Sequence, residues 1–229
     1  MQQISVIENV LKLNDELAAM NRQSLREAGV FCVNLIGGPG CGKTALLETT
    51  LKQLADLHRI GVLVGDLATT RDATRLAAHA TQVVQINTGK ACHLEAHQVR
   101  QAMDRLNLDA LDILVIENVG NLICPVGFDL GQDVKVGMCS VTEGDDKPAK
   151  HPPIIAAVDA LLLNKMDLIQ HVPFSLERFY EDVARLNPAL EVLEVSAHTQ
   201  MIDPWIDWLL ANRLRRVQAA TDRARPVGR

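Results

Sequence analysis

The sequence is poor in aromatic residues and has no long apolar run. Aromatic side chains make up 3% of its 229 residues, whereas hydrophobic residues as a whole make up 48%. A core must therefore be built from Leu, Val, Ile and Ala, and the apolar content is too high for a disordered chain. No segment offers the roughly 20 consecutive apolar residues of a membrane-spanning helix. We expect a globular protein with no membrane partner.

An excess of positive charge and a secretion signal are also lacking. The formal net charge is -5 and the isoelectric point is near 5.8, which argues against nucleic acid as a partner. The first ten residues, MQQISVIENV, have neither the basic nor the apolar region of a secretory signal. Five cysteines, an odd number, do not suit a disulfide scaffold. We therefore expect a cytoplasmic protein, with Cys32 and Cys139 as core residues.

Apolar patterning predicts one domain preceded by a helix. We expect residues 1–29 to form an amphipathic helix that packs on a domain spanning residues 30–216. Within the domain, short Val/Ile/Leu runs alternate with helical stretches, which indicates a doubly wound α/β fold with a mainly parallel sheet. The expected strands are residues 30–36, 61–64, 83–86, 113–116, 134–139, 160–163 and 192–195. The expected helices are residues 43–57, 92–106, 175–186 and 203–215. Strand order does not follow from these runs.

The end of the chain is basic. Arginines 213, 215, 216, 223, 225 and 229 face a single acid, Asp222. We interpret this end as solvated and frayed, and residues 217–229 as a disordered tail.

A glycine-rich loop follows the first expected strand. Residues 37–44 read GGPGCGKT and fit G-x-x-x-x-G-K-[ST] between a strand and a helix. Such a loop points backbone N–H groups at phosphate oxygens, and the helix N-terminus adds partial positive charge. Lys43 would contact the β- and γ-phosphates as a catalytic residue, and the Thr44 hydroxyl would bind Mg²⁺. The predicted nucleotide contacts here are Gly37, Gly38, Pro39, Gly40, Cys41, Gly42, Lys43, Thr44 and Ala45.

A second nucleotide motif, N-K-x-D, ends the expected strand at residues 160–163. Asn164, Lys165 and Asp167 resemble the guanine-reading element of GTPases, in which the Asp accepts hydrogen bonds from guanine N1–H and the exocyclic amine. Adenine has no such donors and would leave a buried carboxylate unpaired, so we predict GTP and GDP as ligands. Ser196 and Ala197 resemble the last guanine-contacting element, although the Lys that often follows is His198.

Acids at the carboxyl ends of strands are candidates for magnesium and catalysis. Asp66 and Glu117 follow two expected strands, where ligands bind in such sheets, and could hold Mg²⁺ together with Thr44. Asp66 and Asp72 are also candidates for orienting an attacking water. A helix cap is the alternative for each acid, and above all for Asp72.

Residues 88–97, TGKACHLEAH, place a thiol and two imidazoles where we expect a helix to begin. A helix N-terminus lowers a thiol pKa, and His93 and His97 would share one helix face. Cys124 lies in the loop after Glu117, at the same sheet edge as Cys92. Thiolate with imidazole suits Zn²⁺ and Ni²⁺, and two chains could complete the ligand set across a two-fold axis. A small buried Cys beside a capping His is the alternative.

Several segments occur in a characteristic order over residues 5–210. They include GDLATTRDA at 65–73, ENVGN at 117–121, CP at 124–125, DLG at 129–131, SVTEGDDKP at 140–148 and NKMDL at 164–168. Together with the phosphate loop and residues 89–96, they resemble HypB, a GTPase family that helps insert nickel into [NiFe] hydrogenase.

The resemblance implies a SIMIBI-class GTPase that hydrolyses GTP slowly, forms a homodimer when GTP-bound and thereby gates metal transfer. It implies nickel or zinc at the dimer interface, held by Cys92, His93 and Cys124, with His97 as an additional candidate. It also implies two partners, a small zinc-containing HypA-like metallochaperone and the hydrogenase large-subunit precursor.

Some features depart from the family pattern. The amino terminus has neither the cysteine-rich nickel motif nor the polyhistidine stretch of some members, so we expect no metal store there. Ala91 stands where the family usually has Gly, and Glu95 stands where Asp is common. Gly38 and Cys41 occupy positions that are usually Ser or Ala. Three alternatives stay open. One is a urease-type nickel GTPase, whose metal motif has a Pro that is absent between Cys92 and His93, and another is a partitioning ATPase, which has a Lys in place of Gly38. The third is a non-hydrolysing metal store or sensor.

Overall fold

A seven-stranded sheet forms the centre of the computed structural model, which describes residues 6–66, 71–89 and 91–224. The strand order is β3-β2-β4-β1-β5-β6-β7, and every neighbouring pair is parallel. The strands are β1 Phe31–Gly37, β2 Ile60–Asp66, β3 Gln82–Asn87, β4 Ile113–Glu117, β5 Val134–Ser140, β6 Ala160–Asn164 and β7 Glu191–Glu194. The predicted doubly wound α/β fold is confirmed.

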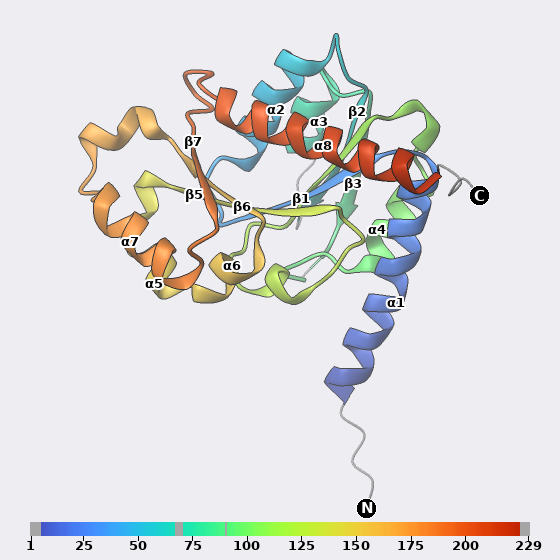
Figure 1. Ribbon diagram of the computed structural model, residues 1–229, viewed down its shortest axis with the longest axis horizontal. Coiled ribbons are helices and arrows are strands. Elements are labelled where there is room, and N and C mark those ends of the chain that lie inside the picture. The colour runs from blue at the N-terminus through green and yellow to red at the C-terminus, as the bar shows by residue number, and fades with distance from the viewer. Residues whose placement is uncertain (1–5, 67–70, 90, 225–229) are drawn as a thin grey trace, which may run out of the picture.

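Helices cover both faces of this sheet (Figure 1). One face carries α2 Lys43–Leu54, α3 Arg71–Ala77 and α8 Asp203–Ala224; the other carries α1 Val6–Glu27, α4 Ala96–Met103, α5 Lys147–Lys150, α6 Pro152–Ala157 and α7 Leu176–Leu186. Short 3₁₀ turns lie at Leu108–Ala110, Cys124–Gly127, Val141–Glu143 and Met166–His171. Four motif residues of the sequence, Leu67 to Thr70, as well as Lys90, Arg225 and Arg229, lie outside the described residues.

The central strand β1 is buried along its whole length, because both faces are covered. Under α8, the rings of Trp205 and Trp208 stack with centroids 6.0 Å apart. The Trp205 indole N–H donates a hydrogen bond of 3.0 Å to the Thr50 hydroxyl on α2. Both tryptophans thus lie where α8 packs on α2, and apart from Phe31 the rest of this core is mainly aliphatic. A second aromatic group, Phe174, Phe179 and Tyr180, lies at α7.

Polar contacts attach α1 to the domain. Asn14 accepts a hydrogen bond from the Ala96 backbone N–H, and Asn21 donates to the Ala96 and Leu130 carbonyls. Gly131, with φ of +95°, allows a close approach, since a Cβ there would lie 2.6 Å from the Asn21 Cβ. The N-terminal half of α1 extends beyond the rest of the molecule (Figure 1).

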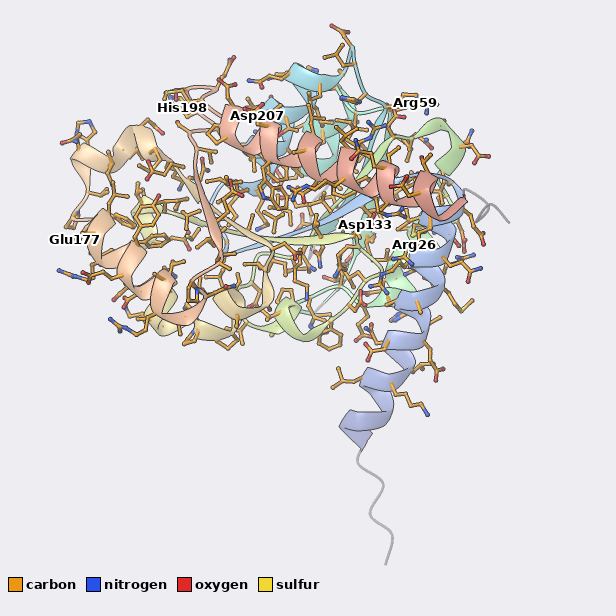
Figure 2. All side chains as sticks on the ribbon, in the orientation of Figure 1. Arg26, Arg59, Asp133, Glu177, His198 and Asp207 are labelled. Atoms are coloured by element: carbon orange, nitrogen blue, oxygen red, sulfur yellow. The ribbon has the colours of Figure 1, made fainter. Side chains whose placement is uncertain are left out.

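The prediction of a disordered tail at residues 217–229 is wrong for residues 217–224. These residues continue α8 to Ala224, and two arginines of the basic chain end form ion pairs: Arg213 with Asp112 at 3.4 Å and Arg216 with Asp133 at 2.7 Å. Figure 2 shows Asp133 close to the C-terminal half of α8. Of the helices that the structure describes, none combines the length and the hydropathy needed to cross a bilayer.

Candidate functional site

The phosphate loop connects β1 to α2 in the geometry that the motif predicts. Gly40 and Gly42 have φ of +78° and +106°, and a Cβ on Gly42 would lie 2.4 Å from the Asn164 side-chain nitrogen. The buried Lys43 ammonium donates to the Gly37 carbonyl at 3.0 Å and the Gly38 carbonyl at 3.4 Å. The loop forms one wall of a cleft of about 420 Å³, to which Pro39, Gly40, Gly42, Lys43, Thr44 and Ala45 contribute.

Cys41 has no access to this cleft. It is completely buried, and burial raises the pKa of its thiol. Its carbonyl accepts a hydrogen bond of 2.8 Å from the Asn164 side chain, whose oxygen accepts a bond of 3.1 Å from the Ala197 N–H. Asn164 therefore joins the phosphate loop to the Ser196–Ala197 loop. The motif alone predicts only base recognition for Asn164, because nothing near it in the chain indicates this contact.

The acids selected from the sequence meet at the cleft. Asp66, Asp72 and Glu117 all line it, and the Thr44 hydroxyl donates to Glu117 Oε1 at 2.7 Å. Burial raises the pKa of Glu117, and the charges of Asp72 and Asp66 add to this effect. Its second oxygen is buried and has no hydrogen-bond partner among the described residues. A hydroxyl, several carboxylates and an unsatisfied buried oxygen suit a hard divalent cation such as Mg²⁺.

The base motif and the last guanine-contacting element also meet. The Ser196 hydroxyl donates to Asp167 at 2.5 Å, and both residues line a second cleft of about 300 Å³. Lys165 is held in the left-handed region at φ of 62°, and its ammonium donates to the Thr142 hydroxyl at 3.1 Å. The Asp167 carboxylate is thus accessible at a cleft, as a base-reading group must be.

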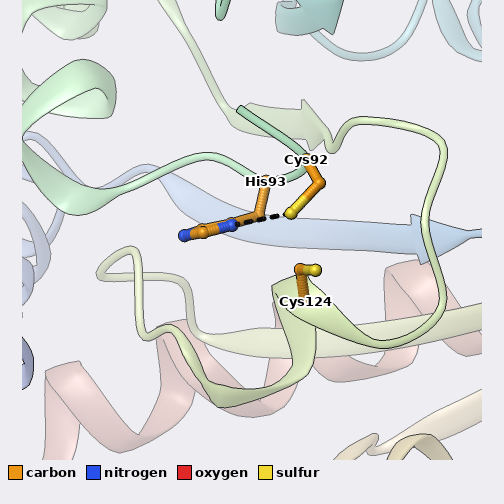
Figure 3. A group of neighbouring side chains, drawn as sticks. All are labelled: Cys92, His93 and Cys124. Carbon is orange, nitrogen blue, oxygen red and sulfur yellow. Dashed lines mark hydrogen bonds between the residues drawn. The ribbon is translucent and has the colours of Figure 1, made fainter. Parts of the chain in front are cut away.

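The structure brings together three of the four predicted soft-metal ligands. The Sγ atoms of Cys92 and Cys124 and a ring nitrogen of His93 all lie within 4.8 Å of one another, and each residue is half-buried (Figure 3). Cys92 Sγ lies 3.6 Å from His93 Nδ1. Two thiols and an imidazole at such distances fit a nickel or zinc ion. His97 is not part of this group.

Two expectations about the local structure of these ligands are wrong. Helix α4 begins at Ala96, so Cys92 and His93 precede it, and His93 and His97 do not share a helix face. The Cys92 thiol pKa is raised, not lowered, by a hydrogen bond with Cys124 and by desolvation. Desolvation lowers the pKa of His93, which favours the neutral imidazole that metals bind. A metal must therefore displace the proton of the Cys92 thiol, whereas the His93 ring already offers a free lone pair.

A short segment joins the two sites. It begins at Glu117 in the nucleotide cleft, pairs Asn121 with Gly37 of the phosphate loop in an isolated β-bridge, and ends at Cys124. A Cβ on Gly120 would lie 3.2 Å from the Pro39 Cα, so segment and loop are in close contact. Asn118, on the same segment, also contacts the loop that contains Cys92 and His93. Its side-chain oxygen accepts a hydrogen bond of 3.2 Å from the Leu94 N–H.

Comparison with known proteins agrees with these features. A family model described as CobW/HypB/UreG, nucleotide-binding domain, matches residues 31–194. A hydrogenase maturation factor HypB from Rhizobium leguminosarum bv. viciae is 44% identical over 214 residues, covering 93% of this chain and 72% of the relative.

Two solved structures are similar over most of their length. HypB from Archaeoglobus fulgidus has a TM-score of 0.83 and 39% identity, with 89% of this chain and 100% of that one covered. HypB from Helicobacter pylori, solved in complex with nickel, has a TM-score of 0.83 and 35% identity, covering 89% of this chain and 96% of that one. The resemblance inferred from the motifs is confirmed, and the chain belongs to the HypB family of hydrogenase maturation factors.

Proposed function

We propose that this chain is a GTP-binding, slowly GTP-hydrolysing metallochaperone that delivers nickel to [NiFe] hydrogenase in the cytoplasm. Nickel is the cargo, held by Cys92, His93 and Cys124, and zinc competes for the same ligands. We further propose that the GTP-bound chain forms a homodimer at this surface. A zinc-containing HypA-like protein and the hydrogenase large-subunit precursor are its partners.

The observation that carries this proposal is the direct connection between the two sites. Glu117 and Cys124 lie seven positions apart on one segment, and Gly120 and Asn121 of that segment contact the phosphate loop. A shift of the loop on phosphate binding must move this segment, because Gly120 and Pro39 are already in close contact. Nucleotide state therefore acts through this segment on one of the two thiol ligands.

At the nucleotide site, the chain's own groups bind and orient the triphosphate. Backbone N–H groups of the phosphate loop and the start of α2 stabilise the phosphates, and Lys43 adds a positive charge. When bound, Mg²⁺ supplies further charge neutralisation at the β- and γ-phosphates, and Thr44 and Glu117 are the residues that would hold it. Asp66 or Asp72 orients the attacking water, since both line the same cleft.

At the base end, Asp167 selects guanine by accepting from N1–H and the exocyclic amine. Ser196 holds the carboxylate in place through its bond of 2.5 Å. Asn164 keeps this region in register with the phosphate loop, because its amide bonds both Cys41 and Ala197. Base and phosphate recognition are thus tied together by one buried side chain.

The decisive experiment measures GTP turnover, nickel affinity and solution mass in the wild type and two variants. In the wild type we expect slow turnover, a dimer with a non-hydrolysable GTP analogue and a monomer with GDP. Lys43→Ala should abolish turnover. Cys124→Ala should reduce nickel affinity by at least tenfold while GTP affinity stays within about twofold, because the thiol does not contact the nucleotide cleft.

Cys139→Ala is the matched control, because it removes a thiol that is buried in the core and is not part of the metal group. It should leave nickel stoichiometry unchanged. A wild-type chain that binds nucleotide without turnover would be a passive store or sensor. A chain that stays monomeric with the GTP analogue, and whose nickel affinity is the same in both nucleotide states, would contradict the proposed coupling.

A further inference from the structure

A carboxylate that the proposed function does not use lies between two imidazoles beside the thiols. Oε1 of Glu95 lies 3.8 Å from His93 Nε2, and Oε2 lies 3.3 Å from His97 Nδ1. The backbone of Glu95 is fixed where α4 begins, since its N–H donates to the Gln98 side chain at 3.0 Å. Each carboxylate oxygen therefore faces a different histidine.

The two ring nitrogens of His93 have opposite surroundings. Nδ1 faces the Cys92 sulfur at 3.6 Å (Figure 3). Nε2 is buried and has no hydrogen-bond partner among the described residues, and Glu95 is the acid opposite it. The Phe128 ring packs against the imidazole with centroids 3.9 Å apart, which restricts the plane of the ring. This packing does not determine which of the two ring nitrogens of neutral His93 carries the proton.

We propose that Glu95 is a positioning residue that holds the His93 proton on Nε2, so that the Nδ1 lone pair faces the two thiols as the ligand atom. The inference rests on the proposed function in that the ion held there is nickel or zinc. A charge-assisted hydrogen bond is about 2.7–2.9 Å long, so a relative shift of roughly 1 Å joins Nε2 to Oε1. A carboxylate bonded to a metal-ligating imidazole fixes its tautomer and raises its basicity.

His97 then has a role other than ligation. Its Nδ1 lies against the second oxygen of Glu95, and its side chain is about half exposed at 49%. It orients the Glu95 carboxylate, and the carboxylate in turn holds the proton of His93, the residue that binds the metal. His93 and His97 thus have different roles, although the sequence pattern offers both as metal ligands.

The test compares Glu95→Ser, Glu95→Gln, His97→Ala and the control Gln98→Ala in the full chain. Ser is a good helix N-cap but is too short to reach His93, so it removes the carboxylate without removing the cap. Gln keeps an oxygen acceptor at the same reach. Gln98→Ala removes the contact that fixes the start of α4 but leaves the carboxylate in place.

The first readout uses metal-free protein and long-range ¹H–¹⁵N correlation of the imidazole ring. We expect His93 in the wild type as the Nε2–H tautomer alone, retained in Glu95→Gln, His97→Ala and Gln98→Ala. In Glu95→Ser it should become a mixture of tautomers. A wild-type His93 protonated on Nδ1, or an unchanged tautomer in Glu95→Ser, would overturn the proposal.

The second readout is nickel affinity by chelator competition, followed with the thiolate-to-nickel absorption band. Loss of the carboxylate in Glu95→Ser should weaken binding about 10- to 100-fold, the usual range for such a partner of a ligand. Glu95→Gln should recover most of this, and His97→Ala should stay within threefold of the wild type. If His97→Ala loses as much as Glu95→Ser, His97 is itself a ligand and the assignment is wrong. If no variant, nor the wild type, binds nickel, the proposed function fails while the tautomer result still decides this inference.

Discussion

Replacing Glu117 with glutamine tests whether this buried carboxylate is a cation ligand. The substitution keeps an acceptor for the Thr44 hydroxyl, now bonded at 2.7 Å, but removes the charge. Glu117 is 5% exposed, and its second oxygen has no partner within the described part of the chain. An unpaired buried polar group costs about 1–3 kcal/mol, and more when it is charged, so removing the charge lowers this cost although the new amide nitrogen is unpaired as well. Without Mg²⁺ we expect the Glu117→Gln variant to unfold roughly 3–10 °C above the wild type, since 1 kcal/mol shifts Tm by about 2–4 °C at this size.

The pH dependence has a defined sign. Burial raises the folded-state pKa of Glu117 above its ordinary 4.5, so the wild type loses stability as pH rises from 4.5 through the raised pKa. A pKa difference of one unit between the folded and unfolded states corresponds to about 1.4 kcal/mol. The advantage of the variant should therefore develop within this pH window and stay constant above it.

Urea denaturation between pH 4 and 8, with and without Mg²⁺ and GDP, measures both effects. The nucleotide with Mg²⁺ should stabilise the wild type more than Glu117→Gln, so that the order of the two proteins reverses. Glu143→Gln is the matched control, because that carboxylate already accepts from the Ser140 N–H and hydroxyl, and its loss should only destabilise. A Glu117→Gln protein less stable than the wild type under both conditions would refute this reasoning.

Three further substitutions have distinct expected outcomes. Asp167→Asn should shift preference from GTP to XTP, because an amide can donate to the xanthine carbonyl; retained GTP preference in competition binding would place base recognition elsewhere. Asp112→Asn should lower Tm at pH 7, and circular dichroism melts should show this difference vanish between pH 3.8 and about 2, because the hydrogen bond with Arg59 holds the pKa of Asp112 at about 2. Gly120→Ala should weaken nucleotide binding several-fold through contact with Pro39, since the new Cβ would lie 3.2 Å from its Cα; calorimetry showing unchanged affinity would indicate that the segment yields freely.

The strands and both nucleotide motifs could be predicted because their signals are local. A strand buried on both faces has a continuous apolar run, and β1 is such a strand. In the phosphate loop, Gly42 is needed for its φ of +106° and for the space that Asn164 occupies, so a short motif already contains the geometry. Each predicted strand lies within two residues of the observed one.

Beside its local Glu95–Gln98 contact, the start of α4 depends on contacts distant in sequence, which could not be predicted. The Ala96 N–H is bonded by Asn14, 82 positions earlier, and the Ala96 carbonyl accepts from Asn21. Helix α1 therefore helps to fix where α4 begins, and residues 92–95 remain outside α4. The orientation of His93 likewise depends on Phe128, 35 positions along the chain.

The extent of α8 has the same kind of cause. A run rich in arginine next to the chain end indicates a solvated segment when read alone. Its acidic partners, Asp112 and Asp133, directly precede strands β4 and β5. Charge pairs of this kind are recognised only once the fold has brought the segments together.

The stacked indoles give the protein an optical probe on one side only. Trp205 and Trp208 are the only two tryptophans of the chain, and both lie on α8. Trp205 is bonded to Thr50 on the helix whose first turn follows the phosphate loop. We therefore expect intrinsic emission to report nucleotide binding through α2, and sulfur-to-metal absorption to report metal binding at the cysteines. Both titrations could then be recorded in one cuvette without a label.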